Sequence, residues 1–312
     1  MGKETQSSVT KGPAVAGPFS PAPSLDFMAL GSLVGAMFLW SGTFIAIKAS
    51  LEYFHPVVLM FLRMTCSSLC MLPLLRGWAL RTRYTRGDWR VILLLIIAEP
   101  CLYFIFEGYA LRYTTASQAG LVTALLPLLV GVSAFLVLKE RLCAKVWTGF
   151  VLAVLGVLLL TLAGEETETA PNPVLGNLLE LCAMSVACVY TLCVRKLPLY
   201  SPFFITAMQS VGGMVFFATL SFFGPFAFPA ELPPLQVLFA VLFLSFASIV
   251  AYGLYNTGIA RIGAGRAAAM TSLIPALTLL MGILFLGESL TPAQCLALVP
   301  LCAGVILSQA SR

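Results

Sequence analysis

Long apolar segments alternate with short polar ones from residue 26 to the end of the chain. Ten segments of about 17 to 24 residues are each long enough for a helix to cross the roughly 30 Å hydrocarbon core of a bilayer. They cover residues 28–47, 56–75, 89–110, 117–138, 146–163, 174–194, 202–223, 235–259, 264–286 and 292–309. Apolar residues follow one another within each segment instead of alternating with polar ones, which excludes a membrane β-barrel. The pattern predicts an all-α integral membrane protein with ten transmembrane helices.

The two halves of this pattern repeat each other. A shift of 148 residues aligns residues of one helix, of the loop after it and of the next helix: Thr123 with Thr271, Pro127 with Pro275, Glu140 with Glu288, and Gly156 with Gly304. Leu and Ala often match by chance between apolar segments, whereas Pro, Glu and Gly in a single register do so rarely. A duplicated membrane unit of this kind is typical of transporters.

Each unit contains five helices, and because five is an odd number the second unit must be inverted in the membrane relative to the first. We therefore predict two inverted five-helix repeats, at residues 26–164 and 172–312. Residues 1–25 are rich in Pro, Gly, Ser and Thr and contain no apolar run. We expect them to form a disordered cytoplasmic tail.

Composition and charge agree with a membrane protein. Hydrophobic residues make up 60% of the chain and charged residues only 10%, whereas a soluble surface needs about a quarter. With the N-terminus in the cytoplasm, fifteen of the 18 basic residues lie on the cytoplasmic side, against Lys48 and Arg112 outside and Arg63 within a helix. The positive-inside rule thus predicts cytoplasmic N- and C-termini. We expect the plasma membrane as location, which in a prokaryote is the bacterial inner membrane.

The nine cysteines lie in or beside apolar segments, and none belongs to a Cys-x-x-Cys pair. The single histidine, His55, is far from all of them in sequence. We therefore expect small thiols that pack in the core, not metal ligands or disulfides. The chain also lacks a Gly-rich phosphate loop and a serine nucleophile with an available histidine, so we expect no enzyme. No cofactor, metal or nucleic-acid partner is expected.

Motifs placed within this plan carry a family resemblance. Each unit has a fourth helix with a proline, then a glutamate and a fifth helix with glycine, and the first unit adds Trp40, Pro56 and Arg63 in its first two helices. This arrangement resembles the EamA family of the drug/metabolite transporter superfamily over nearly the whole chain after the tail. The second unit follows the pattern less fully, because Ser185 stands where the first unit has Trp40.

The resemblance implies a secondary-active exporter or exchanger of small organic metabolites such as amino acids, working by alternating access. It implies a central cavity lined mainly by the first, third, fourth, sixth, eighth and ninth helices, with the fifth and tenth at the periphery. The implied partners are a small-molecule solute and the lipid bilayer. A duplicated helical-bundle channel for small cations or solutes is the alternative, because acidic residues within a bundle could conduct cations.

Four polar groups that a bilayer would otherwise exclude stand out in the predicted helices: Arg63, Glu99, Glu107 and Glu180. At 1.5 Å per residue they lie about 5 to 17 Å below the outer helix ends. Charges at such depths need a partner or water. Arg63 forms either a structural ion pair with the third helix or a site for a substrate carboxylate. Glu180 is either a snorkelling interfacial carboxylate or a cavity group.

The third helix carries two of these carboxylates. Glu99 and Glu107 could face one groove, with Tyr103 between them. One arginine can neutralise about one of the three carboxylates, so at least one carboxyl group should carry a proton near neutral pH. Glu99 is the deepest and is our candidate for proton coupling. The alternative is that Glu99 is permanently neutral and hydrogen-bonds the helix behind it.

Two prolines in the fourth and ninth helices are hinge candidates. Pro127 and Pro275 each release the carbonyl four residues earlier, at Thr123 and Thr271, whose hydroxyls can adjust the broken turn. Each break is either a static packing kink or a gating hinge.

The eighth helix carries a polar stripe of Tyr252, Tyr255 and Asn256, spaced three and four residues apart. With Trp40, this stripe is a candidate for substrate contact, and ordinary bonding between helices is the alternative. Gly156 and Gly304 permit close helix approach within one chain or between two copies, which leaves a homodimer open.

Overall fold

The computed structural model describes residues 26–79, 85–138, 144–226 and 228–309. The predicted tail at residues 1–25 and Glu140 lie outside these ranges. Within them the chain is helical almost throughout. Nine helical segments of the described residues are long and apolar enough to cross a membrane, and a shorter apolar helix follows at Pro292–Ser308. The predicted all-α membrane architecture is confirmed.

The helices of the first half are α1 (Phe27–Ser50), α2 (Pro56–Ala79), α3 (Asp88–Ile96), η1 (Ile97–Leu102), α4 (Tyr103–Tyr113), α5 (Ala116–Val122), η2 (Thr123–Leu125), α6 (Leu126–Leu138) and α7 (Ala144–Leu162). Those of the second half are α8 (Pro173–Arg195), α9 (Pro202–Phe223), α10 (Leu235–Ile262), α11 (Ala264–Met270), α12 (Leu273–Leu286) and α13 (Pro292–Gln309). The third, fourth and ninth predicted helices are therefore interrupted, while the others run without a break.

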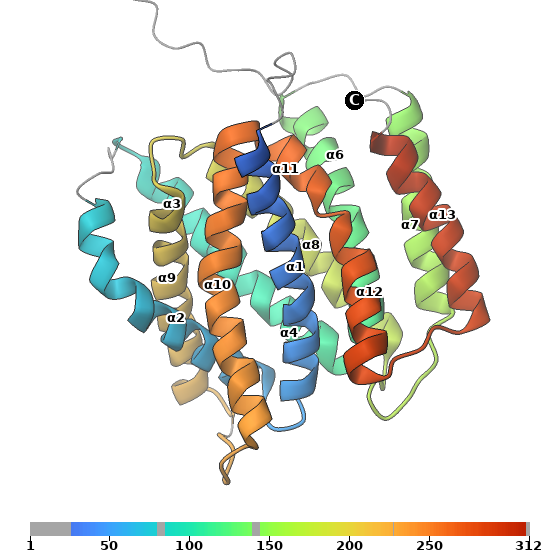
Figure 1. Ribbon diagram of the computed structural model, residues 1–312, viewed down its shortest axis with the longest axis horizontal. Helices are drawn as coiled ribbons and strands as arrows, with labels where there is room; N and C mark the ends of the chain where they lie inside the picture. The colour runs from blue at the N-terminus through green and yellow to red at the C-terminus, as the bar shows by residue number, and fades with distance from the viewer. Residues whose placement is uncertain (1–25, 80–84, 139–143, 227, 310–312) are drawn as a thin grey trace, which may run out of the picture.

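Helix packing follows the inverted repeat. α1 packs along α10, and their counterparts in the other repeat, α8 and α4, pack along each other. Three further pairs join counterparts directly: α2 with α9, α5 with α12, and α7 with α13. Figure 1 shows α1 beside α10 and, at one edge of the bundle, α7 beside α13. A pseudo-twofold axis in the membrane plane that relates the two units accounts for this pattern.

Glycines allow α7 and α13 to approach closely. A Cβ atom on Gly149 would lie 2.6 Å from the carbonyl oxygen of Gly304, and one on Gly156 would lie 2.5 Å from the backbone nitrogen of Leu301. A Cβ on Gly304 would lie 2.4 Å from the nitrogen of Ala153. These contacts are between backbones, so no side chain can move to relieve them. Gly156 and Gly304 thus serve packing within the chain, and a homodimer stays a prediction.

The fourth and ninth helices break at equivalent threonines. Thr123 donates its hydroxyl to the carbonyl of Gly120 at 2.7 Å, and Thr271 donates to the carbonyl of Ala268 at 2.6 Å. Both hydroxyls thus bond the turn that precedes the break, and their role at a hinge stays a prediction. The prolines do not lie in mid-helix as expected. They fall within the first turn of α6 and of α12, just after each break, where a missing backbone N–H is tolerated.

The third predicted helix is not continuous. The prediction of a single helix over residues 89–110 was wrong, because the structure has α3, η1 and α4 there. Glu99 has φ −145° and ψ 116°, an extended conformation inside η1. The cause is local, because Pro100 follows and a residue that precedes proline is pushed out of the helical region. The break turns the Glu99 side chain away from the direction that a regular helix would give it.

A carboxylate of the second repeat caps a helix of the first. Glu288, in the loop between α12 and α13, accepts hydrogen bonds from the backbone N–H groups of Ala116 and Ser117 at 2.8 and 2.7 Å. These groups begin α5 and have no partner within that helix. The contact fixes the start of α5 against the end of α12.

The cysteines only partly follow the expectation of core-packed thiols. Cys101, Cys188 and Cys193 are buried. Four others are exposed on the outer helix surfaces, namely Cys70, Cys182, Cys295 and Cys302. In a bilayer these surfaces face lipid, which accepts a small apolar thiol as readily as a protein core does. No metal-binding group of His, Cys, Asp or Glu occurs among the described residues.

Candidate solute cavity

A buried cavity lies between the two repeats, where broken and unbroken helices meet. Its lining is Trp40, Thr43, Phe44, Arg63, Glu99, Tyr103, Glu107, Thr123, Leu126, Met184, Ala187, Tyr190, Thr191, Tyr252, Tyr255 and Ile274. These residues come from the first, third, fourth, sixth, eighth and ninth predicted helices, as the resemblance implies, with Arg63 added from the second. The cavity volume is about 30 Å³, room for about two water molecules. A solute the size of an amino acid requires the lining to move apart.

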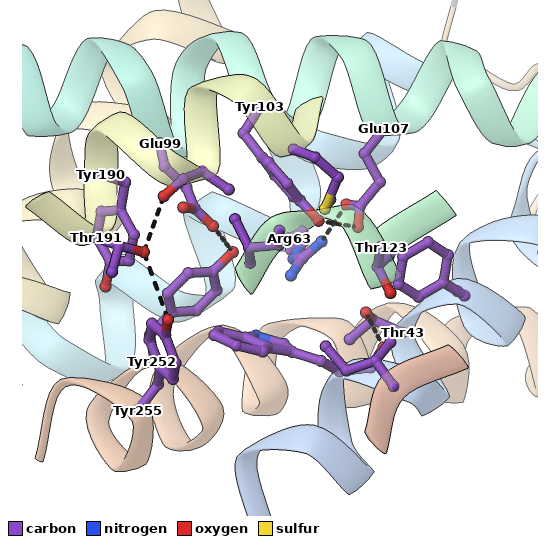
Figure 2. A pocket seen from close by; sticks show the side chains of 16 residues that line it. Thr43, Arg63, Glu99, Tyr103, Glu107, Thr123, Tyr190, Thr191, Tyr252 and Tyr255 are labelled. Atoms are coloured by element: carbon purple, nitrogen blue, oxygen red, sulfur yellow. Dashed lines mark hydrogen bonds and ion pairs between the residues drawn. The ribbon is translucent and has the colours of Figure 1, made fainter. Parts of the chain in front are cut away.

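Arg63 is the positively charged residue of the lining, and side chains from two other helices, α4 and α10, hold its guanidinium. Its Nη1 lies 3.7 Å from Oε2 of Glu107 on α4, and its Nε donates to the hydroxyl of Ser248 on α10 at 2.6 Å. The guanidinium also lies 4.0 Å from the ring centroid of Phe104. Figure 2 shows it projecting into the middle of the lining, with Glu107 and Tyr103 on one side and Thr43 on the other. The prediction that Arg63 pairs with a carboxylate of the third helix is confirmed.

The two carboxylates of the third helix have separate partners. Tyr103 donates its hydroxyl to Oε1 of Glu107 at 3.0 Å, while Glu99 accepts a hydrogen bond from the hydroxyl of Tyr252. The backbone carbonyl of Glu99 accepts from the amide of Gln209 on α9 at 3.2 Å. Both carboxylates are buried, and both line the cavity. Tyr103 lies between them as the spacing suggested.

Aromatic rings form one wall of the cavity. The Trp40 ring centroid lies 5.1 Å from that of Tyr252 and 4.8 Å from that of Tyr255. The ring of Tyr190 meets that of Tyr252 edge to face at 6.0 Å. The indole N–H of Trp40 has no hydrogen-bond partner among the described residues, so it is free to donate to a solute. Such a wall offers flat apolar faces and several hydroxyl groups within a small volume.

Asn256 does not line the cavity, although it belongs to the predicted stripe. Its Oδ1 accepts from the hydroxyl of Tyr190, and its amide donates to the hydroxyl of Thr206 at 3.3 Å. This geometry matches the alternative of bonding between helices. Asn256 positions Tyr190 from behind, and Tyr252 and Tyr255 are the members of the stripe that reach the cavity.

The hinge candidates border the cavity unequally. Thr123 belongs to the lining, and so does Ile274, the residue before Pro275. Thr271, Pro127 and Pro275 do not belong to it. The break in the fourth helix therefore opens directly onto the cavity, and the break in the ninth adjoins it.

Glu180 lies apart from the other membrane carboxylates. Its exposed fraction is 0%, and neither carboxylate oxygen has a hydrogen-bond partner among the described residues. Because a snorkelling side chain would reach the surface, that interpretation is wrong. Glu180 is buried on α8, and it does not belong to the lining of the cavity.

Sequence reasoning missed three polar residues of the site. Tyr190 and Thr191 belong to the lining, and Ser248 holds Arg63. Tyr190 and Thr191 stand inside an apolar helix, and that was the one available signal for them. Ser248 gives no such signal, because hydroxyls that bond their own helix are common in membrane segments.

Comparison with known proteins shows the family to which the chain belongs. A profile described as the EamA-like transporter family matches residues 27–162 and 174–309. The chain belongs to the EamA-like transporter family, and it is a multi-pass membrane transporter.

Relatives agree with this class. The chain is 26% identical over 264 residues to the uncharacterized transporter YetK of Bacillus subtilis, covering 82% of this chain and 79% of that one. It is 28% identical over 285 residues to the uncharacterized transporter YcxC of the same organism, covering 85% and 87%. An uncharacterized transporter of Archaeoglobus fulgidus is 26% identical over 287 residues, with 88% and 95% covered. A protein of known crystal structure matches with a TM-score of 0.67 at 21% identity, covering 92% of this chain and 98% of that one, which shows a shared fold.

Proposed function

We propose that this transporter is a secondary-active carrier of small organic metabolites such as amino acids. It acts as an exporter or exchanger in the plasma membrane, where its partner is the solute itself. The observation that carries the proposal is the cavity, in which one cation, two carboxylates and an aromatic wall meet between the inverted repeats. Transporter sites of this kind lie at the interface of such repeats.

The cavity offers a place for each end of an amino acid. Arg63 presents a planar fork suited to a carboxylate group. Glu99 and the rings of Trp40 and Tyr252 suit an ammonium group, through charge and through cation–π attraction. Because the cavity holds about 30 Å³, the solute binds only after the lining opens to one side.

The breaks in the fourth and ninth helices support a transport mechanism of alternating access. Each lies at an equivalent threonine, and each is followed by a proline that cannot restore the helical bond. Rocking of one unit against the other about these points would open the cavity to one side while closing it to the other. The hinge residues of this motion are Thr123, Pro127, Thr271 and Pro275.

Proton coupling through Glu99 completes the proposal. Arg63 pairs with Glu107 and not with Glu99, so an ionised Glu99 would be a buried charge with only a hydroxyl for a partner. Such a charge costs several kcal/mol in a bilayer. Glu99 therefore carries a proton in this closed conformation and exchanges it when the cavity opens.

Transport into proteoliposomes tests the proposal. Labelled amino acids, organic acids and cationic drugs are offered to the purified protein with and without a pH gradient. We expect saturable uptake of at least one amino acid, accumulation under the gradient, and loss of that accumulation in Glu99→Gln. Glu165→Gln, in an exposed outer loop, is the matched control. Accumulation and a pH profile in Glu99→Gln equal to wild type would remove Glu99 as the coupling site.

A further inference from the structure

Among the residues that the structure describes, Glu180 is the one buried carboxylate that the proposed solute site does not use. It lies on α8, fully buried, with both oxygens lacking a hydrogen-bond partner among the described residues. Among the described residues, the titratable groups whose charge acts on it are Glu107 and Tyr103, both on α4. Neither carries a positive charge, and Arg63 pairs with Glu107 instead. An ionised Glu180 would thus be an unpaired buried charge, so in this conformation it holds a proton.

Further unpartnered oxygens lie between Glu180 and the outer face. Asn177 precedes Glu180 by one helical turn, and its amide nitrogen donates to Gln118 and Thr161 at 3.0 and 3.1 Å. Its amide oxygen has no hydrogen-bond partner among the described residues. The hydroxyl oxygens of Thr114 and Ser117 are likewise buried and unpartnered. Buried polar groups of this kind are normally bridged by water.

Thr114, Ser117 and Asn177, the unpartnered oxygens on the outer side of Glu180, are called the track below. A Cβ atom on Gly176, beside Asn177, would lie 2.6 Å from Cβ of Thr114, so α8 and the end of α4 touch at this level. The backbone of Ser117 is held by Glu288, which also lines a cavity of about 530 Å³ beside Lys48. That cavity opens on the side predicted to be extracellular. The track thus lies between the outer face and Glu180, and α8, which carries Glu180, packs along α4, which carries Glu107.

We propose that Glu180 is the proton-entry residue of this transporter. It takes protons from the outer face along Thr114, Ser117 and Asn177 and passes them to Glu107. In the transfer the O–H bond of Glu180 breaks, its electron pair stays on Glu180 as carboxylate, and a new O–H bond forms on Glu107. A further proton from the outer water then restores Glu180.

The transfer has a direct consequence for the solute site. Once Glu107 is neutral, the guanidinium of Arg63 loses its charged partner and is free to bind a solute carboxylate. Proton entry is thereby linked to solute binding without any contact between Glu180 and the solute. This inference rests on the proposed function, because it describes how protons reach the proposed site.

Infrared spectroscopy of the full protein in liposomes tests the inference without any solute. The external pH is stepped between alkaline and acidic values, and the carbonyl band of protonated carboxyl groups is followed in time. We expect wild type and the control Glu165→Gln to show a reversible change in this band. Glu180→Gln, which keeps the size of the side chain, should lose that change.

A second variant tests the track, and it keeps the inference testable if Glu180→Gln does not fold. Thr114→Val removes one oxygen of the track with almost no change of shape. We expect it to keep the full band change but to reach it about tenfold more slowly. An unchanged rate in Thr114→Val, an unchanged spectrum in Glu180→Gln, or a wild-type band that ignores external pH would overturn the inference. If no tested solute is transported, the proposed function fails, while the spectroscopic result still decides the role of Glu180.

Discussion

Arg63 and Glu107 face each other across the boundary between α2 and α4, with 3.7 Å between Nη1 and Oε2 and side-chain exposures of 1% and 3%. Replacing Arg63 by Met would leave Glu107 as a buried charge without a cation. Removing one partner of a buried pair costs about 3–5 kcal/mol. We therefore expect Arg63→Met to lower the folded yield and the melting temperature in detergent.

The double variant Arg63→Met with Glu107→Leu separates the role of Arg63 in stability from its role in binding the solute. It replaces both charges by apolar groups of similar size, so we expect it to regain most of the lost stability. We expect no regain of solute uptake, because the carboxylate-binding fork is gone. Normal folding of Arg63→Met alone would contradict the structural part of this account.

The prolines at the helix breaks should control the rate of exchange. Pro127→Ala or Pro275→Ala restores a backbone N–H that can bond the carbonyl of Thr123 or Thr271 and straighten the turn. We expect the exchange rate to fall by about tenfold, with a smaller change in the half-saturating concentration. Rates equal to wild type in both single variants would leave the prolines as packing features.

His55 should make stability depend on pH. Its ring stacks on Phe226 with 4.6 Å between centroids, and its Nδ1 accepts the backbone N–H of Val57 at 3.3 Å, which requires an unprotonated nitrogen. Burial, and then the charge of Arg112, lower the pKa of His55 below its ordinary value of 6.5. The unfolded chain thus binds more protons below pH 6.5, so stability is lost as the pH falls through that range.

His55→Phe keeps a ring against Phe226 and cannot titrate. We expect its melting temperature to change less than that of wild type between neutral and mildly acidic pH. Thermal unfolding in detergent across this range makes the comparison. Parallel curves for the two proteins would show that His55 does not cause the pH dependence.

Orientation in the membrane follows from the basic residues and is open to a labelling test. In a cysteine-free background, we expect a cysteine within residues 1–25 to be protected from an impermeant maleimide in intact cells. A cysteine at position 166, in the loop before α8, should react. Labelling of the tail from outside would reverse the topology and place the track to Glu180 on the cytoplasmic side.

Much of the fold could be predicted from the sequence, because apolar length alone marks a helix that must cross a bilayer. The segment 202–223 coincides with α9, which runs Pro202–Phe223. The break at Glu99 could not be seen in hydrophobicity, which reports side chains and not backbone conformation. Its only signal was Pro100, the residue that follows.

The contacts of the site could be predicted from the sequence where electrostatics alone determines which residues pair. Arg63 had to find a carboxylate because neither charge tolerates lipid. The sequence left Glu99 and Glu107 as possible partners, and the structure shows Glu107. The contacts of Asn256 depend instead on which neighbouring helix packs against its side of α10. Asn256 faces Thr206 on α9, whereas Tyr255, one residue earlier, faces the cavity. Tertiary packing between the two repeats decides such differences, and a single helix does not contain that information.

Counterflow is the measurement that tests the central claim most directly. Proteoliposomes are loaded with an unlabelled amino acid that the protein transports and then diluted into a trace of the labelled form. An alternating-access carrier must exchange one molecule for another, so we predict that the label rises transiently above equilibrium and that an excess of external unlabelled amino acid abolishes the rise. Label that only approaches equilibrium, with no saturation and with a conductance far above carrier turnover, would contradict the account and favour a channel.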